Sequence, residues 1–99
     1  MSSGDIERYV VTLTFEEHSL TDLNELNNSL TRGGFLLTLS DDEGKIHELG
    51  INSYGLISTL DQAEVEELAR SLGKVVLGIE PEVSITTWDN WLQEINSHL

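Results

Sequence analysis

The sequence predicts an α+β domain whose elements follow the order β-α-β-β-α-β, with one short helix near the C-terminal end. Three observations support this prediction. Apolar and polar residues alternate near both ends of the chain, around Tyr9 to Phe15 and around Val83 to Thr87. Two segments between these ends carry apolar residues at helical spacing. A small, acidic and glycine-containing segment, Ser40 to Gly44, divides the region between the two helices.

The first strand is predicted from Ile6 to Phe15, because its apolar side chains alternate with Thr12 and Thr14 as in a half-buried strand. The first helix follows, since leucines recur at a spacing of three or four residues. Ser19 or Thr21 can cap its start, and residues 32–34, Arg-Gly-Gly, supply a cationic last turn and a glycine stop. The leucines are Leu20, Leu23, Leu26 and Leu30.

The second strand is predicted over the apolar run from Phe35 to Leu39, and the turn at residues 40–44 makes it one arm of a hairpin. The chain returns through Lys45 to Leu49 and resumes at Tyr54 to Thr59. We expect these two stretches to form one third strand that is bent or bulged near Gly50 and Gly55.

The second helix is predicted from its N-cap Asp61, which forms a capping box pattern with Glu64. Glycine at position 73 or 78 ends this helix. Its apolar face comprises Leu60, Val65, Leu68, Ala69, Leu72 and Val76. The single proline, Pro81, then opens the last strand, and Thr87 is the expected cap of a terminal helix. One stripe of that helix carries Trp88, Trp91, Leu92 and Ile95.

This order of elements predicts a ferredoxin-like βαββαβ fold, in which a four-stranded antiparallel sheet carries two helices on one face. Residues 1–99 contain no repeat and no linker that would divide them, so we expect a single domain. The remaining sheet face, or the terminal helix with its two tryptophans, offers a surface through which a homodimer could form.

Composition limits the class of protein. The 99 residues include 18 acidic and 5 basic side chains, for a net charge of −13, which repels phosphate backbones and favours basic partners. The absence of cysteine excludes disulfides, thiolate zinc sites and cysteine nucleophiles. Residues 1–7 lack the pattern of a signal peptide, and no apolar run approaches the roughly 20 residues of a membrane helix. We therefore expect a cytoplasmic protein with no membrane contact.

The sequence assigns no catalytic residue, metal or cofactor. Its glycines form no phosphate loop or dinucleotide fingerprint, and no glycine-flanked serine elbow is present. His18, His47 and His98 do not have the spacing of zinc ligands. The consecutive carboxylates at positions 41–43 are more typical of a solvated hairpin turn than of a calcium or magnesium loop.

Any site for a polyanion must use the few cations of the chain. The basic side chains are Arg8, Arg32, Lys45, Arg70 and Lys74. Arg8 lies at the entrance of the first strand and Arg32 ends the first helix. Lys45 lies with His47 in the returning arm of the hairpin, so these side chains could converge if a dimer brings sheet edges together. The candidate RNA-binding residues are therefore Arg8, Arg32, Lys45 and His47.

Several segments together resemble the GhoS family, the antitoxins of type V toxin-antitoxin systems. The matching segments are residues 8–12 (RYVVT), 42–44 (DEG), 52–60 (NSYGLISTL), 63–68 (AEVEEL) and 83–91 (VSITTWDNW). The resemblance covers nearly the whole chain. It implies a small ferredoxin-like endoribonuclease that cleaves the messenger RNA of a small membrane-damaging toxin.

The sequence departs from the family pattern at two places. The first helix carries Asp22, Glu25 and two asparagines on its middle turns, where the family is expected to bear arginine. The resemblance also implies a fold similar to that of the small CRISPR-associated nucleases, which place a metal-binding aspartate at the end of the first strand; this chain has Thr14 there. Two alternatives therefore stay open: a diverged family member without nuclease activity, and a non-catalytic acidic module that inhibits a basic protein or mimics a nucleic acid.

Overall fold

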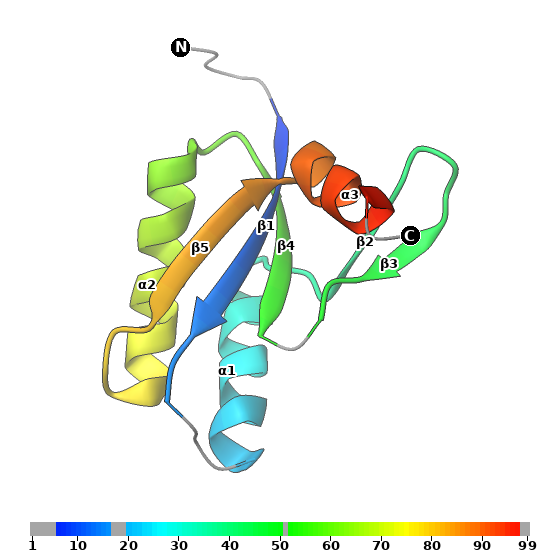
Figure 1. Cartoon of the computed structure of the whole chain (residues 1–99). Helices are drawn as coiled ribbons and strands as arrows, with labels where there is room; N and C mark the ends of the chain where they lie inside the picture. The colour runs from blue at the N-terminus through cyan, green and yellow to red at the C-terminus, as the bar shows by residue number, and fades with distance from the viewer. Residues whose placement is uncertain (1–5, 17–19, 51, 98–99) are drawn as a thin grey trace.

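The structure is a computed structural model that describes residues 6–16, 20–50 and 52–97 (Figure 1). The observed order of strands and helices agrees with the sequence-based prediction, except that the expected third strand is two separate strands. The elements are β1 (Glu7–Thr14), α1 (Leu20–Arg32), β2 (Thr38–Ser40), β3 (Ile46–Glu48), β4 (Ser53–Ser58), α2 (Gln62–Leu77), β5 (Glu82–Thr87) and α3 (Trp88–Ser97).

The main sheet has three antiparallel strands in the order β4-β1-β5. Val11 in the central strand β1 lies opposite Tyr54 of β4 and Ile85 of β5, which fixes the register on both sides. Because strand residues alternate between faces, Tyr9, Val11 and Leu13 all point to the same side. That side is covered by α1 and α2, which lie behind the sheet in Figure 1.

The predicted four-stranded sheet is wrong in one respect, because β2 does not join the main sheet as a fourth strand. Only Leu36, just before β2, pairs with the sheet, through two backbone hydrogen bonds of 2.7 Å to Gly55 of β4. The chain then leaves the plane of the sheet, and β2 pairs with β3 in a separate two-stranded hairpin.

The third strand is likewise not continuous. Gly50 and Asn52 both have left-handed backbone conformations, with φ of 105° and 61°. The Ser53 N–H donates to the Gly50 carbonyl at 3.3 Å, which closes a turn at this point. The residues expected to form one bulged strand therefore divide into β3, in the hairpin, and β4, in the main sheet.

Two hydrophobic clusters lie on opposite sides of the sheet. The larger one joins β1 and β4 to α1 and α2, and Leu26, Leu30, Val65 and Ala69 are its fully buried helical residues. The smaller one joins Val10, Leu39, Leu49 and Trp88, with Trp91 and Leu92 packed against it. The hairpin and α3 cover the side of the sheet that α1 and α2 leave uncovered. Neighbouring residues of β1 that point to opposite sides, such as Val10 and Val11, are therefore both buried.

Both predicted caps of the later helices are present. Asp61 accepts a hydrogen bond from the Glu64 N–H at 2.9 Å, and the Glu64 side chain accepts from the Asp61 N–H at 3.1 Å. Gly78, with φ of 78°, ends α2. Thr87 Oγ1 accepts from the Asn90 N–H at 3.3 Å at the start of α3. Within the described ranges, no helix has both the length and the apolar character that crossing a membrane requires.

Candidate functional site

The turn between β2 and β3 is organised by one carboxylate. Asp41 Oδ1 accepts hydrogen bonds from the backbone N–H groups of Glu43 and Lys45, each at 2.9 Å. Gly44 adopts φ of 82°, a left-handed conformation that glycine reaches without strain. The predicted turn is confirmed, and one oxygen of Asp41 is fully used in holding it.

The other oxygen of Asp41 contacts His47. Asp41 Oδ2 lies 2.9 Å from His47 Nε2, and these two side chains are only 18% and 17% exposed. The hydrogen bond from His47, followed by the one from the Lys45 backbone, lowers the pKa of the Asp41 carboxyl below its ordinary value. Asp41 is therefore an ionised carboxylate at neutral pH. A carboxylate only accepts hydrogen bonds, so His47 Nε2 carries the proton that they share.

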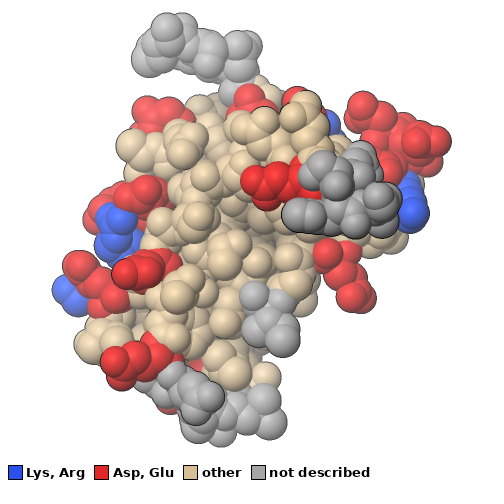
Figure 2. Space-filling view, viewed as in Figure 1, with Lys and Arg blue, Asp and Glu red and all other residues tan. Residues whose placement is uncertain are grey.

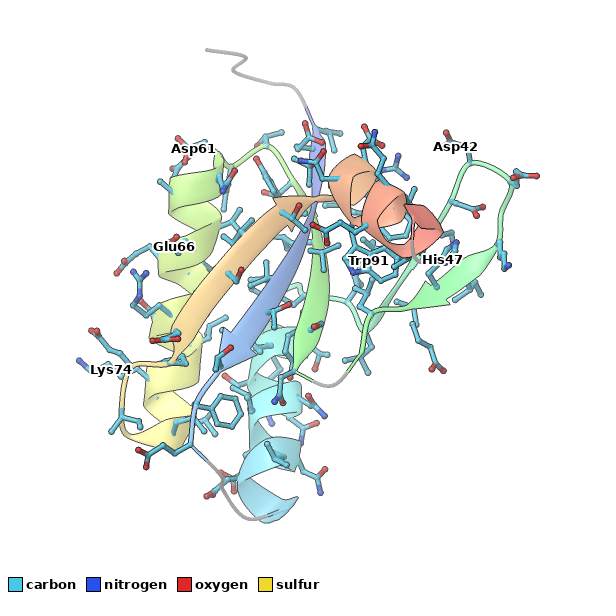
Figure 3. All side chains as sticks on the ribbon, viewed as in Figure 1. Asp42, His47, Asp61, Glu66, Lys74 and Trp91 are labelled. Atoms are coloured by element: carbon cyan, nitrogen blue, oxygen red, sulfur yellow. The ribbon has the colours of Figure 1, made fainter. Side chains whose placement is uncertain are left out.

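His47 packs against two tryptophans of α3. The indoles of Trp88 and Trp91 are stacked, with ring centroids 5.2 Å apart and planes 13° apart. The imidazole meets both indoles in T-shaped contacts, with centroid distances of 5.6 Å to Trp88 and 6.0 Å to Trp91. Figure 3 shows His47 and Trp91 facing each other between β3 and α3. The imidazole ring is therefore oriented both by these aromatic contacts and by its hydrogen bond to Asp41.

Arg8 joins β1 to the same group of side chains. Its guanidinium carbon lies 5.9 Å from the centroid of the Trp88 ring. Its Nη1 donates to the Ser40 carbonyl at 3.4 Å, and its Nη2 lies 3.8 Å from Asp42 Oδ1. Arg8 and His47 therefore contact the same buried indole. We call Arg8, Asp41, His47, Trp88 and Trp91 the hairpin cluster.

A pocket of about 380 Å³ opens beside His47. Lys45 and Leu92 line it together with the carboxylates of the turn, Asp41, Asp42 and Glu43. Lys45 is exposed, and the structure gives it no side-chain partner among the described residues. A ligand in this pocket would meet an imidazole, an ammonium group and the acidic turn.

The four predicted RNA-binding residues do not all meet. Arg8, Lys45 and His47 belong to β1 and the hairpin and lie near the hairpin cluster or its pocket. Arg32 is the last residue of α1, in the helical layer on the other side of the sheet, and is exposed. The four predicted residues therefore lie in two separate regions of the molecule: Arg32 is in one, and the other three are near the hairpin cluster.

No pattern in the sequence predicted the pairing of Asp41 with His47. The acidic turn was expected to be solvated, and His47 to be an exposed RNA-binding side chain. The available signal was the hairpin register, in which Leu39 lies opposite His47, so that Asp41 follows on the neighbouring strand within reach. Of the other histidines considered, His18 and His98 lie outside the described residues. Among the residues that are described, no group of three or more His, Asp or Glu side chains could hold a metal ion.

A larger cavity, of about 620 Å³, lies between α1, the hairpin and the start of β4. Leucine and asparagine side chains line most of it, including Asn27 of α1. The Tyr54 hydroxyl donates to Asn27 Oδ1 at the wall of this cavity. Burial raises the pKa of Tyr54 to about 12, so the hydroxyl stays protonated at neutral pH.

Carboxylates neutralise most of the basic side chains that the structure places. Arg70 pairs with Glu66 and Glu67 on α2, and Lys74 Nζ lies 3.8 Å from Glu80. Arg8 pairs with Asp42, as described above. Figure 2 shows acidic side chains along both edges of one face, with a mostly uncharged centre. Positive potential is therefore scarce, and Lys45 and Arg32 are its least neutralised sources in the described part of the chain.

Comparison with known proteins identifies relatives. The chain is 56% identical over 91 residues to the uncharacterized protein YdiZ of Escherichia coli strain K12, covering 92% of this chain and 95% of that protein. The same identity and coverage hold for YdiZ of Escherichia coli O157:H7. Residues 1–94 match the family model described as endoribonuclease GhoS. The hairpin cluster lies entirely within the matched residues, and the chain belongs to the endoribonuclease GhoS family.

Proposed function

We propose that this protein is an endoribonuclease antitoxin that cleaves the messenger RNA of a small membrane-damaging toxin in the cytoplasm. The observation that carries the proposal is the family match, which spans residues 1–94. The architecture is compatible with a ferredoxin-like fold in which the fourth strand has been reduced to the Leu36–Gly55 bridge. Fold alone does not assign activity, so the proposal depends on the family and on the side chains of the site.

The hairpin cluster and its pocket are the proposed RNA-binding region. Arg8, Lys45 and His47 can contact phosphate oxygens, and the half-buried Trp91 offers an aromatic surface for a base. A chain with a net charge of −13 repels RNA over most of its surface. Binding would then depend on these few groups, and it should weaken steeply as salt screens them.

The test is incubation of the purified full chain with toxin transcripts and with unrelated transcripts of equal length. Cut positions are mapped at low and at physiological salt. Cleavage of the toxin messenger at defined positions, with the unrelated RNA spared, would support the proposal. Intact transcripts under all conditions would contradict it. The hairpin and α3 cover the sheet face that was expected to be open. Light scattering on the same sample would therefore test a homodimer formed through α3.

A second candidate is a non-catalytic acidic module that occupies a basic protein surface. The ion pairs of Arg8, Arg70 and Lys74 favour it, because they leave the negative charge of the surface dominant. Such a module, or a diverged family member without nuclease activity, would cleave no RNA. Salt-sensitive binding to a basic protein, with no RNA binding at low salt, would favour this candidate over the endoribonuclease.

A further inference from the structure

We infer that His47 is the general base of the proposed ribonuclease and that Asp41 is the positioning residue that aims it. The inference rests on the proposed endoribonuclease function and adds a catalytic group to it. His47 would take the proton from the ribose 2′-hydroxyl at the scissile phosphate, a task that suits imidazole near neutral pH. The hairpin cluster supplies three observations for this role.

The first observation is the contact of one imidazole nitrogen with a carboxylate. Asp41 is a carboxylate that accepts from His47 Nε2 at 2.9 Å. The neutral ring consequently carries its free lone pair on Nδ1, and no hydrogen-bond partner of Nδ1 is found in the part of the chain that the structure describes. A carboxylate on one ring nitrogen and a free lone pair on the other is the arrangement that makes histidine an oriented base.

The second observation is that Asp41 does not need His47 to shape the turn. Its Oδ1 already accepts from two backbone N–H groups, while Oδ2 is directed to the imidazole. Both backbone hydrogen bonds that hold this turn use Oδ1. The additional contact fixes the position and the tautomer of a side chain on the neighbouring strand.

The third observation is the set of groups around the ring. The hairpin contributes Asp41, Asp42, Glu43 and Lys45 to the pocket that His47 lines. From α3 the contacts are the two indoles and Leu92, which carry no charge. From β1, the Arg8 guanidinium carbon lies 5.9 Å from the centroid of the Trp88 ring, and Arg8 Nη2 lies 3.8 Å from Asp42 Oδ1. Arg8 and Lys45 are therefore the cations near a scissile phosphate when the 2′-hydroxyl of the adjoining ribose lies at His47.

The proposed step balances with the groups of the substrate and water. His47 Nδ1 takes the 2′-hydroxyl proton, the 2′-oxygen bonds to phosphorus, and the bond from phosphorus to the 5′-oxygen breaks. The leaving 5′-oxygen takes a proton from water, and the imidazolium returns its proton to the resulting hydroxide. The products are a 2′,3′-cyclic phosphate and a 5′-hydroxyl end.

The test uses three variants of the full chain. His47→Gln keeps a donor for Asp41 and removes the base. Asp41→Asn keeps an Oδ1 acceptor for the turn and presents an amide donor to Nε2, which moves the ring proton to Nδ1. Glu48→Gln is the matched control, because Glu48 adjoins His47 on β3 and, by strand alternation, points to the other face of the hairpin.

The measurements are the cleavage rate across pH, the chemistry of the RNA ends, the melting temperature, and the nitrogen chemical shifts of the His47 ring. We expect His47→Gln to lose about 100-fold or more of the rate without unfolding. Asp41→Asn should lose a comparable factor, shift the pH profile of the rate, and exchange the two nitrogen shifts. Glu48→Gln should keep the wild-type rate, and the wild type should leave cyclic phosphates.

The outcomes separate the two proposals. Wild-type cleavage that His47→Gln retains, or cleavage that leaves 3′-hydroxyl and 5′-phosphate ends, overturns the role of His47 and leaves the endoribonuclease function standing. A wild type that cleaves no RNA overturns both. A proton found on Nδ1 in the wild-type protein overturns the positioning role of Asp41 without any activity measurement.

Discussion

The side chain of Leu39 lies directly over the α-carbon of Gly55. A Cβ atom at position 55 would stand 2.6 Å from Leu39 Cγ, which is closer than atoms can approach without displacement. This contact occurs where the chain leaves the main sheet after Leu36 has bonded to Gly55. Glycine at this position therefore lets the hairpin pack over the sheet.

Gly55→Ala should destabilise the fold by about 1 to 3 kcal/mol, because Leu39 must move to admit the methyl group. Urea denaturation measures the loss. The combined variant with Leu39→Ala is the control, since the smaller side chain removes the clash. Its free-energy cost should be less than the sum of the two single changes. Simple additivity would show that the two residues do not compete for this space.

Tyr54→Phe should make stability less sensitive to alkaline pH. The pKa of Tyr54 is about 12 in the folded chain and about 10 in the unfolded chain. The unfolded state thus loses this proton first as pH rises above about 10, and stability falls. The expected loss is about 1 kcal/mol at about pH 11.

Urea denaturation at about pH 8 and about pH 11 checks this difference. Tyr9 also has a raised pKa, because of its burial, and it stays in both proteins, so only the additional loss in the wild type is assigned to Tyr54. Equal alkaline losses in the two proteins would contradict the prediction.

Asp61→Ala should cost about 1 kcal/mol, since it removes the N-cap of α2 and leaves the Glu64 N–H without its side-chain acceptor. Asp61→Asn is the matched control, because asparagine caps helices about as well as aspartate. The thermal midpoint of each variant gives the comparison. A loss of similar size in both variants would assign the effect to charge and not to the cap.

Lys45→Ala and Arg32→Ala should differ in their effect on RNA binding. Lys45 lines the pocket beside His47, whereas Arg32 ends α1 on the other side of the sheet. Lys45→Ala should weaken RNA binding. It should also reduce the slope of log K against log salt concentration by about one, as expected for the loss of a single phosphate contact. Arg32→Ala should leave both unchanged. Both side chains are exposed, so neither change should alter stability by more than about 0.5 kcal/mol. The reverse order of effects would place the RNA on the helical layer.

Local patterns predicted the elements that depend on local interactions. The alternation in β1 and β5, and the capping box of α2, each involve residues close together in the sequence, and all three are confirmed. The prediction of a four-stranded sheet was wrong because the hairpin packs over the sheet, where Leu39 contacts Gly55, sixteen positions further along the chain. Neither residue has a distinctive local signal for that contact.

The candidate site shows the same division. The cations and histidine could be named from composition, and the hairpin turn from its acidic and glycine residues. The partner of His47 depended on strand register, and its aromatic neighbours, Trp88 and Trp91 of α3, lie 41 and 44 positions further along the chain. Periodicity predicts that Trp88 lies on the apolar face of a helix. It does not predict that the indole packs against His47 of the hairpin.

The contacts that hold the His47 ring come from the hairpin, early in the sequence, and from α3, which follows it by about 40 residues. During synthesis, residues 38–48 leave the ribosome well before Trp88 and Trp91, so the nascent hairpin has no indoles to pack against. A product that stops before residue 88 would contain Asp41 and His47 but lack the surface that orients the ring. Translation past Trp91 is therefore a structural requirement for the assembled hairpin cluster.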